Sequence, residues 1–295
     1  MRHSFNARRL RGFTLVEMVI VILITGILGG MVAVFIRVPV QGYLDVTARA
    51  VLADTADTAA RRLTRDVRQA LPNSLRVSTD GLYLELLLTR TGGSYLSESD
   101  PPGLGNVLGF DPAGSHANSF TVVGAMPADA LGTRQAIRAG DQVVVYNLGQ
   151  AYTPNDAYAC SAATGCNRAR VAGVAGNVVT LQDPPFALDP APLPSPSKRF
   201  QVVTMPVTYA CNLETGTLTR YAGYAIQAAQ PVVAEAAPLL GGALLARQVT
   251  ACRFSYGKLA NVQRGLVNVD LSLGAANSST GILRLVQQVQ ARNTP

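Results

Sequence analysis

The sequence predicts an α+β fold, with one long N-terminal helix ahead of a β-rich antiparallel head. Two patterns predict it: residues 13–72 combine an apolar run with an amphipathic helical repeat, and residues 73–295 contain short β-rich runs between turn residues. Composition limits the alternatives. Of the 295 residues, 48% are hydrophobic and 15% are charged, against roughly 25% charged residues in typical soluble domains, so we do not expect wholesale disorder.

The first segment carries the signals of membrane insertion. Residues 1–12 hold four arginines and no acidic residue, which gives this segment +4 of the chain's net charge of +7. The run from Phe13 to Ile36 has no charge after Glu17 and is about long enough to cross the ~30 Å hydrocarbon layer as a helix. By the positive-inside tendency, the arginines place the N-terminus in the cytoplasm and the rest of the chain beyond the inner membrane. We therefore expect one transmembrane helix at residues 13–37.

Two simpler explanations fit this segment less well. A secretory signal peptide would have an apolar stretch of about 7–15 residues closed by an A-x-A-like cleavage site, and neither condition is met here. A generic membrane anchor leaves Glu17 unexplained, because a carboxylate inside an apolar segment costs about 2.5–3.5 kcal/mol on insertion scales. Glu17 therefore indicates a partner or a function.

The residues around Glu17 carry a family resemblance. Residues 11–17 read RGFTLVE and lead directly into the apolar helix, a pattern that resembles the prepilin N-terminus of type IV pilins and type II secretion pseudopilins. The resemblance implies that residues 1–12 are a leader, which a prepilin peptidase removes by cleavage between Gly12 and Phe13. It also implies methylation of the new Phe13 amine, retention of the apolar helix, and other minor and major pilins as partners.

The physical chemistry of these residues agrees with the resemblance. Gly12 has no Cβ, which lets the backbone enter a tight peptidase groove. Cleavage creates an ammonium at Phe13, and in a filament this group could pair with Glu17 of a neighbouring subunit, which makes the buried charge tolerable. Gly26 and Gly30 have the G-x-x-x-G spacing that allows helices to pack closely in lipid. Gly is also simply common in membrane helices, and both interpretations stay open.

Residues 38–72 predict a periplasmic continuation of the same helix. Pro39 should kink or loosen it locally, and Pro72 should end it. Arginines gather in its last turns, which favours a solvated helix end or a subunit contact over a phosphate site. Apolar residues recur at spacings of three or four and form one face, which we expect to pack on the head. This face consists of Leu44, Ala48, Leu52, Ala56, Ala59, Leu63, Val67 and Ala70.

Residues 73–295 predict a β-rich periplasmic head. Strands are expected where β-branched and aromatic residues gather between turn residues. The clearest is residues 267–273, in which apolar and polar residues alternate strictly. Residues 92–114 and 183–197 are rich in Gly, Pro and Ser and predict long loops. The other expected strands are residues 81–88, 119–123, 142–146, 177–181, 200–204, 207–211, 217–221, 249–256 and 282–291.

The order of elements extends the resemblance into the head. A long helix, an irregular β segment and antiparallel strands in succession resemble the pilin fold along most of the chain. Four segments of the C-terminal half resemble J-type minor pseudopilins and a minor pilin of the MSHA pilus. This resemblance implies a minor pilin that takes part in assembling or priming a type IV pilus of the MSHA type. The long loops make the head bulky for a repeating subunit, which favours a place in a tip complex. The four segments are residues 209–211, 216–220, 252–256 and 289–295.

All four cysteines lie beyond the predicted membrane span, in a compartment that permits disulfides. Three pairings are formally possible. We favour Cys160 with Cys166, which closes a small polar loop, and Cys211 with Cys252, which ties two predicted strands together. A metal site is disfavoured, because the cysteine spacing is loose and no histidine lies near.

Three other roles stay open: a minor pseudopilin of type II secretion, a pilus-tip adhesin or DNA-uptake subunit, and a membrane-anchored periplasmic hydrolase. The hydrolase has the least support, because the only histidines are His3 and His116 and the common catalytic and nucleotide-binding motifs are missing. We therefore expect no enzyme activity and no cofactor. Removal of the leader lowers the net charge from +7 to +3, so we expect no nucleic-acid partner either.

Overall fold

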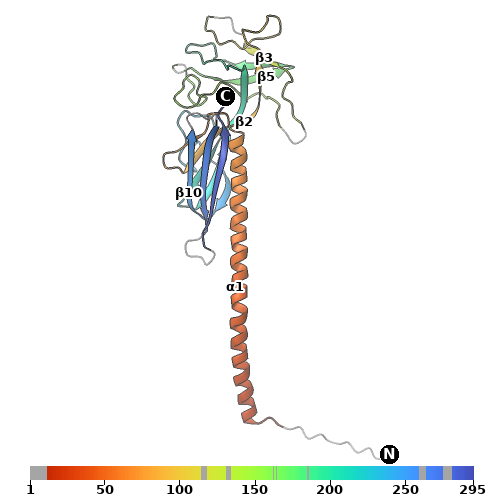
Figure 1. Ribbon diagram of the computed structural model, residues 1–295, viewed down its shortest axis with the longest axis vertical. Coiled ribbons are helices and arrows are strands. Elements are labelled where there is room, and N and C mark those ends of the chain that lie inside the picture. The colour runs from red at the N-terminus through yellow and green to blue at the C-terminus, as the bar shows by residue number, and fades with distance from the viewer. Residues whose placement is uncertain are drawn as a thin grey trace, which may run out of the picture. The chain divides into compact units, whose positions relative to one another are not determined.

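The computed structural model describes residues 12–113, 118–130, 134–161, 163, 165–184, 186–258, 264–274 and 281–295, apart from the side chains of Val38, Lys258 and Arg264. It divides into two compact units, residues 1–51 and 52–295. The class is α+β, as the sequence predicts. One long helix, α1 (Leu15–Arg68), precedes antiparallel strands that are numbered β1 to β12 in the described residues (Figure 1).

Helix α1 begins and ends within a few residues of its predicted limits. Thr14 caps its first turn, since the Thr14 Oγ1 accepts a hydrogen bond of 3.3 Å from the backbone nitrogen of Glu17. The helix is continuous through Pro39. The proline ring removes one backbone donor, and membrane-type helices tolerate this loss without breaking. The last turn leads to Pro72 and to Asn73, which has a left-handed φ of 61°.

The apolar stripe of α1 is buried only in its second half. Ala56, Ala59, Leu63 and Val67 belong to the main core of residues 52–295. Leu44, which the periodicity places on the same stripe, is 59% exposed. The stripe therefore packs on the head from Leu52 onward, and its predicted N-terminal part does not.

The strands form two antiparallel sheets. The larger has the order β1-β2-β3-β6-β5-β4-β7-β8-β9, with an additional pairing between β2 and β7, and the smaller has the order β10-β11-β12. The larger sheet consists of β1 (Arg76–Val77), β2 (Tyr83–Tyr95), β3 (Ser119–Val123), β4 (Gln142–Val145), β5 (Arg168–Ala175), β6 (Val178–Gln182), β7 (Arg199–Asn212), β8 (Thr217–Ala222) and β9 (Ala243–Arg247). The smaller consists of β10 (Val249–Lys258), β11 (Arg264–Leu273) and β12 (Leu283–Arg292).

The additional pairing closes six strands into a barrel. Going round the ring, β2 pairs with β3, then β6, β5, β4 and β7 follow, and β7 pairs with β2 again. The barrel has its own apolar core, in which Phe120 and Phe200 pack edge to face with ring centroids 5.1 Å apart. Figure 1 shows β3 and β5 gathered at the far end of β2. We call this part the inserted barrel, because it lies in sequence between the first half of β2 and the second half of β7.

The remaining strands form the sheet on which α1 packs. They are β1, the first half of β2, the second half of β7, β8 and β9, joined by the three-stranded sheet in one core. Within that core, Leu84 and Val207 of the larger sheet lie with Val267 and Val289 of the smaller. We call this part the helix-bearing part of the head.

The observed strands differ from the predicted ones in three respects. Residues 200–204 and 207–211 form the single strand β7, with Pro206 opposite Leu87. The proline is tolerated because β7 has β2 as its only partner there: β4 pairs with it up to Val203, and β8 from Val207 onward.

Residues 92–95 were expected in a loop and belong to β2. A Cβ on Gly93 would come within 2.9 Å of the Phe200 ring, so this glycine makes room for a core aromatic side chain and does not mark a turn. Strands β1, β5 and β9 were not predicted at all. In β5 the inward residues near its start are Ala169 and Val171, which alternate with arginines and give a weak β signal.

Candidate assembly site

The N-terminal end of α1 holds the residues that the sequence assigns to processing and assembly. Residues 1–11 of the predicted leader lie outside the described part of the chain, so the description starts at Gly12. Gly12 and Phe13 precede the helix, and Phe13 is exposed. Their bond therefore lies in exposed, non-helical chain just before the first helical turn.

Glu17 stands in the first turn of α1. Its backbone nitrogen donates to Thr14, and the spacing Thr14-x-x-Glu17 is that of a capping box, a signal that the sequence reasoning overlooked. Among the residues that the structure describes, no ion pair or side-chain hydrogen bond reaches the Glu17 carboxylate. The cap explains why the chain becomes helical here, but it leaves the negative charge without a counter-ion among the described residues.

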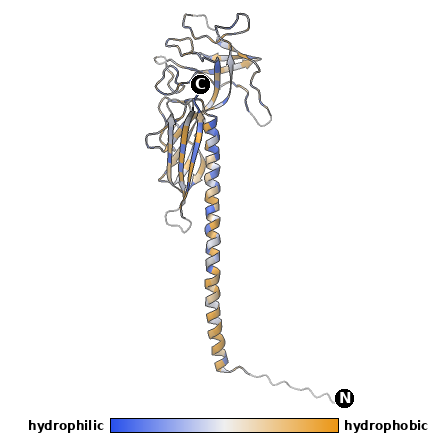
Figure 2. Cartoon of the chain, in the orientation of Figure 1, coloured by the Kyte–Doolittle hydropathy of each residue, from blue (hydrophilic) through white to orange (hydrophobic). Residues whose placement is uncertain are grey.

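The apolar half of α1 presents its side chains outward. Every described residue from Gly12 to Arg37 is exposed, and Figure 2 shows this stretch as the most hydrophobic of the helix. By length and composition α1 could cross a membrane once. A Cβ added at Gly26 or at Gly30 would meet no atom within 4 Å. The structure therefore leaves this glycine face open and does not test its role in helix packing.

A buried carboxylate, which the sequence reasoning missed, fixes the second half of α1 to the head. Asp66 is 3% exposed. Its Oδ2 accepts hydrogen bonds from the Tyr209 hydroxyl at 2.8 Å and from the Arg220 Nε at 2.7 Å. Burial and the negative charge of Asp66 raise the pKa of Tyr209, so the tyrosine stays a hydrogen-bond donor. The available signal was the position of Asp66 on the apolar stripe, three residues after Leu63.

A second buried ion pair holds a long loop against the same sheet. The Arg76 Nε lies 2.6 Å from the Glu85 Oε2, and both side chains are buried. Burial raises the pKa of Glu85 more than Arg76 lowers it. Arg76 also donates to the carbonyl oxygens of residues 227–229, and Tyr224 donates to the Glu85 Oε1 at 2.9 Å. This cluster is saturated by internal bonds, which indicates a structural role for it.

The cysteines pair as the sequence led us to favour. Cys160 lies beside Cys166 with Cα atoms 4.5 Å apart, and Cys211 lies beside Cys252 with Cα atoms 6.3 Å apart. The second disulfide joins β7 to β10 and so ties the two sheets around the core that α1 completes. The first closes a short loop before β5.

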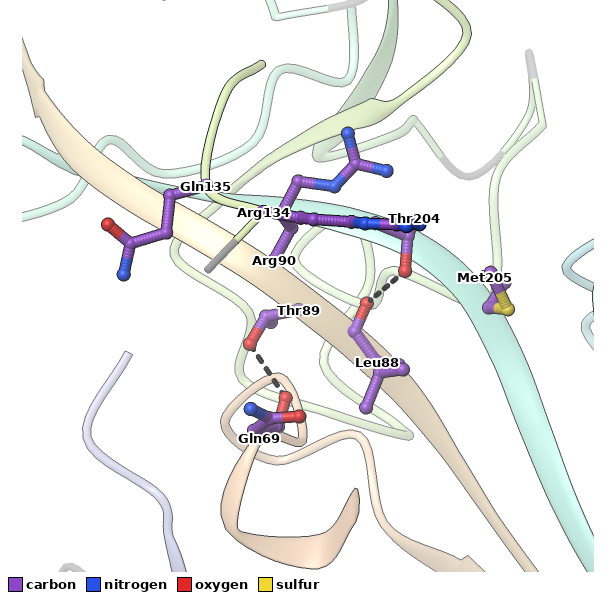
Figure 3. A pocket seen from close by; sticks show the side chains of 8 residues that line it. All are labelled: Gln69, Leu88, Thr89, Arg90, Arg134, Gln135, Thr204 and Met205. Carbon is purple, nitrogen blue, oxygen red and sulfur yellow. Dashed lines mark hydrogen bonds between the residues drawn. The ribbon is translucent and has the colours of Figure 1, made fainter. Parts of the chain in front are cut away.

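The cleft where α1 ends shows no catalytic arrangement (Figure 3). It has a volume of about 480 Å³. The hydroxyls of Thr89 and Thr204 donate to the carbonyls of Gln69 and Leu88, as the dashed lines in Figure 3 show. The described lining residues include no histidine, cysteine or carboxylate that could act as a base. The lining residues are Gln69, Leu88, Thr89, Arg90, Arg134, Gln135, Thr204 and Met205.

The structure also bears on the expectation that the chain has no metal site and no catalytic histidine. In the described ranges, no group of three or more His, Cys, Asp or Glu side chains is placed to hold a metal ion. His3 and His116 lie outside the described residues. The described residues therefore give no positive evidence for catalysis.

Comparison with known proteins supports the assignment of the N-terminus. Residues 7–33 match the family model described as the prokaryotic N-terminal methylation motif. This range contains the Gly12–Phe13 bond, Glu17, Gly26 and Gly30. No curated protein and no solved structure matches the chain. The chain thus carries the methylation motif of type IV pilin-like prepilins on a helix that fits a membrane-anchored, single-span protein.

Proposed function

We propose that this protein is a minor pilin that takes part in assembling or priming a type IV pilus of the MSHA type, within a tip complex. The observation that carries the proposal is the methylation motif at residues 7–33, on an apolar helix half whose described side chains are exposed. Such a half needs lipid before assembly and other helices afterwards. A prepilin-type subunit meets both needs.

Processing follows from this assignment. A prepilin peptidase cleaves between Gly12 and Phe13 at the cytoplasmic face of the inner membrane, and the new Phe13 amine is methylated. Residues 13–37 then span the membrane, residues 38–72 continue the helix in the periplasm, and residues 73–295 form the periplasmic head. The arginines of the leader favour this orientation.

Glu17 acts in this proposal as the group that sets the register between subunits. Its carboxylate has no partner in the described chain, and a mature Phe13 ammonium on a neighbouring subunit supplies one. Gly26 and Gly30 give the neighbouring helices a flat face on which to pack.

The head favours a place at the tip. The inserted barrel adds a closed set of strands to the helix-bearing part and makes this subunit bulky for a filament that repeats it many times. The MSHA assignment rests on the C-terminal sequence segments alone. A minor pseudopilin of type II secretion would share the processing and the helix, and the neighbouring genes distinguish the two systems.

N-terminal analysis of the protein extracted from membranes tests the class. We expect mass spectrometry to find Phe13 as the first residue, with one added methyl group, and Met1 retained when the prepilin peptidase is deleted. Gly12→Val should block cleavage, because a Cβ is then present at the cut site. A mature protein that starts at Met1 in the presence of the peptidase, or beyond Ala33, would refute the proposal.

A pair of variants tests the role of Glu17. Glu17→Leu should insert normally but co-purify with partner pilins at a level lower by on the order of 10-fold or more, because the partner's ammonium is left unpaired. Thr14→Ala is the matched control, since it removes the helix cap and keeps the charge. Equal co-purification of Glu17→Leu and the wild type would exclude the pairing.

Copy number tests the tip position. Sheared filaments should contain this protein at a small fraction of the major subunit, by quantitative mass spectrometry. A finding that it is the dominant filament component would overturn the assignment as a minor pilin.

A further inference from the structure

The outer wall of the inserted barrel carries a cleft that the assembly role does not use. Its volume is about 550 Å³. The floor consists of outward residues of β5 and β6, because Ala169 and Val171 of β5 point into the barrel core and the alternating Arg168 and Arg170 point the other way. One wall is formed by Cys160, Ser161, Gly165 and Cys166, which lie at the Cys160–Cys166 disulfide, and the other is formed by Leu188 and Asp189.

The two walls are held against each other by close packing. Gly165 has a φ of +70°, and a Cβ there would come within 2.2 Å of the Pro190 carbonyl oxygen and 2.7 Å of Pro154. A glycine is therefore required for the two loops to approach this closely. With the disulfide across its base, this wall is a constrained element, which is what a binding site needs to keep its shape.

Arg168 gives the cleft its chemical character. Its Nε is buried and has no hydrogen-bond partner. Among the described residues no ion pair or hydrogen bond reaches any part of the guanidinium. Desolvation lowers the pKa of Arg168. A partly buried cation is stabilised when an acceptor meets it, and the described residues do not provide one for Arg168.

The other charged residues of the cleft also lack ion-pair and side-chain hydrogen-bond partners among the described residues. Arg170, Asp183 and Asp189 line it, and none forms an ion pair or side-chain hydrogen bond within the described ranges. Gln182 adds an amide to the floor, and Leu188, which is exposed, adds an apolar surface. Two cations, two carboxylates and one amide around a single cleft can satisfy a ligand that carries both an anionic group and hydrogen-bond donors.

We propose that this cleft binds a small ligand through a carboxylate held by Arg168, while Asp183 and Asp189 accept hydrogen bonds from the ligand's hydroxyl or ammonium groups. The planar guanidinium edge matches the two oxygens of a carboxylate. Two sources supply this chemistry: an acidic sugar, with a carboxylate and hydroxyls, and an acidic amino acid, with a carboxylate and an ammonium. The inference concerns the head alone and does not depend on the filament that it serves.

The test is a binding titration of the full chain in detergent micelles, followed by chemical-shift changes in the head. The probes are glucuronate, glutamate and, as the uncharged control, methyl glucoside. Binding of glucuronate alone identifies an acidic sugar site, binding of glutamate alone identifies an acidic amino-acid site, and binding of both identifies carboxylate recognition. If neither acid binds up to tens of millimolar, or methyl glucoside binds equally well, the proposal is wrong.

Arginine variants tie the binding to Arg168. Arg168→Gln should weaken binding by on the order of 10- to 100-fold, since a charge-assisted pair is lost. The affinity of Arg168→Lys should lie between those of the wild type and Arg168→Gln, because lysine keeps the charge but cannot form the bidentate contact of a guanidinium. Arg199→Gln, an exposed arginine on β7 away from the cleft, should bind normally.

A stability measurement separates this role from a purely structural one. Without ligand, Arg168→Gln should melt at the same temperature as the wild type or higher, because an unpaired buried charge has been removed. A lower melting temperature together with unchanged binding would show that Arg168 stabilises the fold instead, and would overturn the proposal.

Discussion

The two halves of α1 are one helix, yet their apolar side chains have opposite surroundings. Leu28 in the first half is 55% exposed, whereas Leu63 in the second half is 1% exposed and belongs to the main core. Both halves are rich in apolar residues, so the difference lies in what covers them. The second half finds its cover in its own chain, and the first half must find it in lipid or in other subunits. The same kind of residue stabilises the fold in the second half and, in the proposed function, stabilises assembly in the first.

The largest effect on the stability of the head is expected from Asp66→Ala, in the buried second half of α1. This substitution leaves the Arg220 guanidinium and the Tyr209 hydroxyl without their buried acceptor, so the free energy of unfolding of the head should fall by about 3–5 kcal/mol. Urea unfolding of the full chain in detergent, followed by tyrosine circular dichroism, measures it. Asp57→Ala is the control, because the Asp57–Arg61 pair is exposed on the same helix and should contribute less than about 1 kcal/mol. Equal effects would show that burial of Asp66 does not matter.

A matched pair of leucine truncations compares the halves directly. Leu63→Ala should lower the free energy of unfolding by about 2–5 kcal/mol through the cavity that it leaves. Leu28→Ala should leave the stability of the head unchanged, since it contacts no core. The same unfolding assay applies to both. A loss from Leu28→Ala comparable to that from Leu63→Ala would break the contrast.

Acid should weaken the head through a surface contact of the inserted barrel. The hydrogen bond from Lys198, followed by those from Ser97, lowers the pKa of Asp100 from 3.8 to about 2. Because the folded pKa lies below the unfolded one, this contact stabilises the head above pH 3.8, and its contribution is lost as the pH falls from 3.8 toward about 2. Asp100→Asn should therefore be slightly less stable than the wild type at neutral pH and equal to it near pH 2. A difference that persists unchanged at the lower pH would contradict the assignment.

The smallest effect on the stability of the head is expected from Glu17→Leu, and this variant tests the contrast between the two halves of α1 most sharply. Glu17→Leu should leave the free energy of unfolding of the head within about 0.5 kcal/mol of the wild type, because the side chain contacts no described residue of the head. The same variant is expected to lose partner pilins. Destabilisation of the head by Glu17→Leu would mean that the first half of α1 supports the fold after all.

Local patterns were enough to predict the helix and much of the head. The apolar run, the stripe ending near Ala70 and the stop at Pro72 depend on neighbours within a few residues, and the alternation at residues 267–273 marked β11 correctly. The Thr14-x-x-Glu17 cap was available by the same reasoning and was overlooked. Both disulfides followed from the placement of the cysteines.

Features that depend on distant pairing could not be predicted. The barrel closes because Ser94 lies opposite both Arg199 and Val123, residues far along the chain. Asp66 stood on an apolar stripe, but only the fold brings Tyr209 and Arg220 to it. In the same way, Arg168 lies in β5, a strand that the sequence did not predict, and only the fold brings it beside Asp183 and Asp189.

The continuity of strands β2 and β7 determines how the head would carry a mechanical load. Each runs unbroken from the helix-bearing part into the inserted barrel, and they pair with each other from Tyr83 opposite Ala210 to Ser94 opposite Arg199. A pull on the barrel therefore travels along two continuous backbones, without a flexible connection between the parts. Their shared ladder would be sheared along its length, so that many hydrogen bonds carry the load together. In the proposed function, this continuity lets the subunit transmit tension from the inserted barrel to the helix that anchors it.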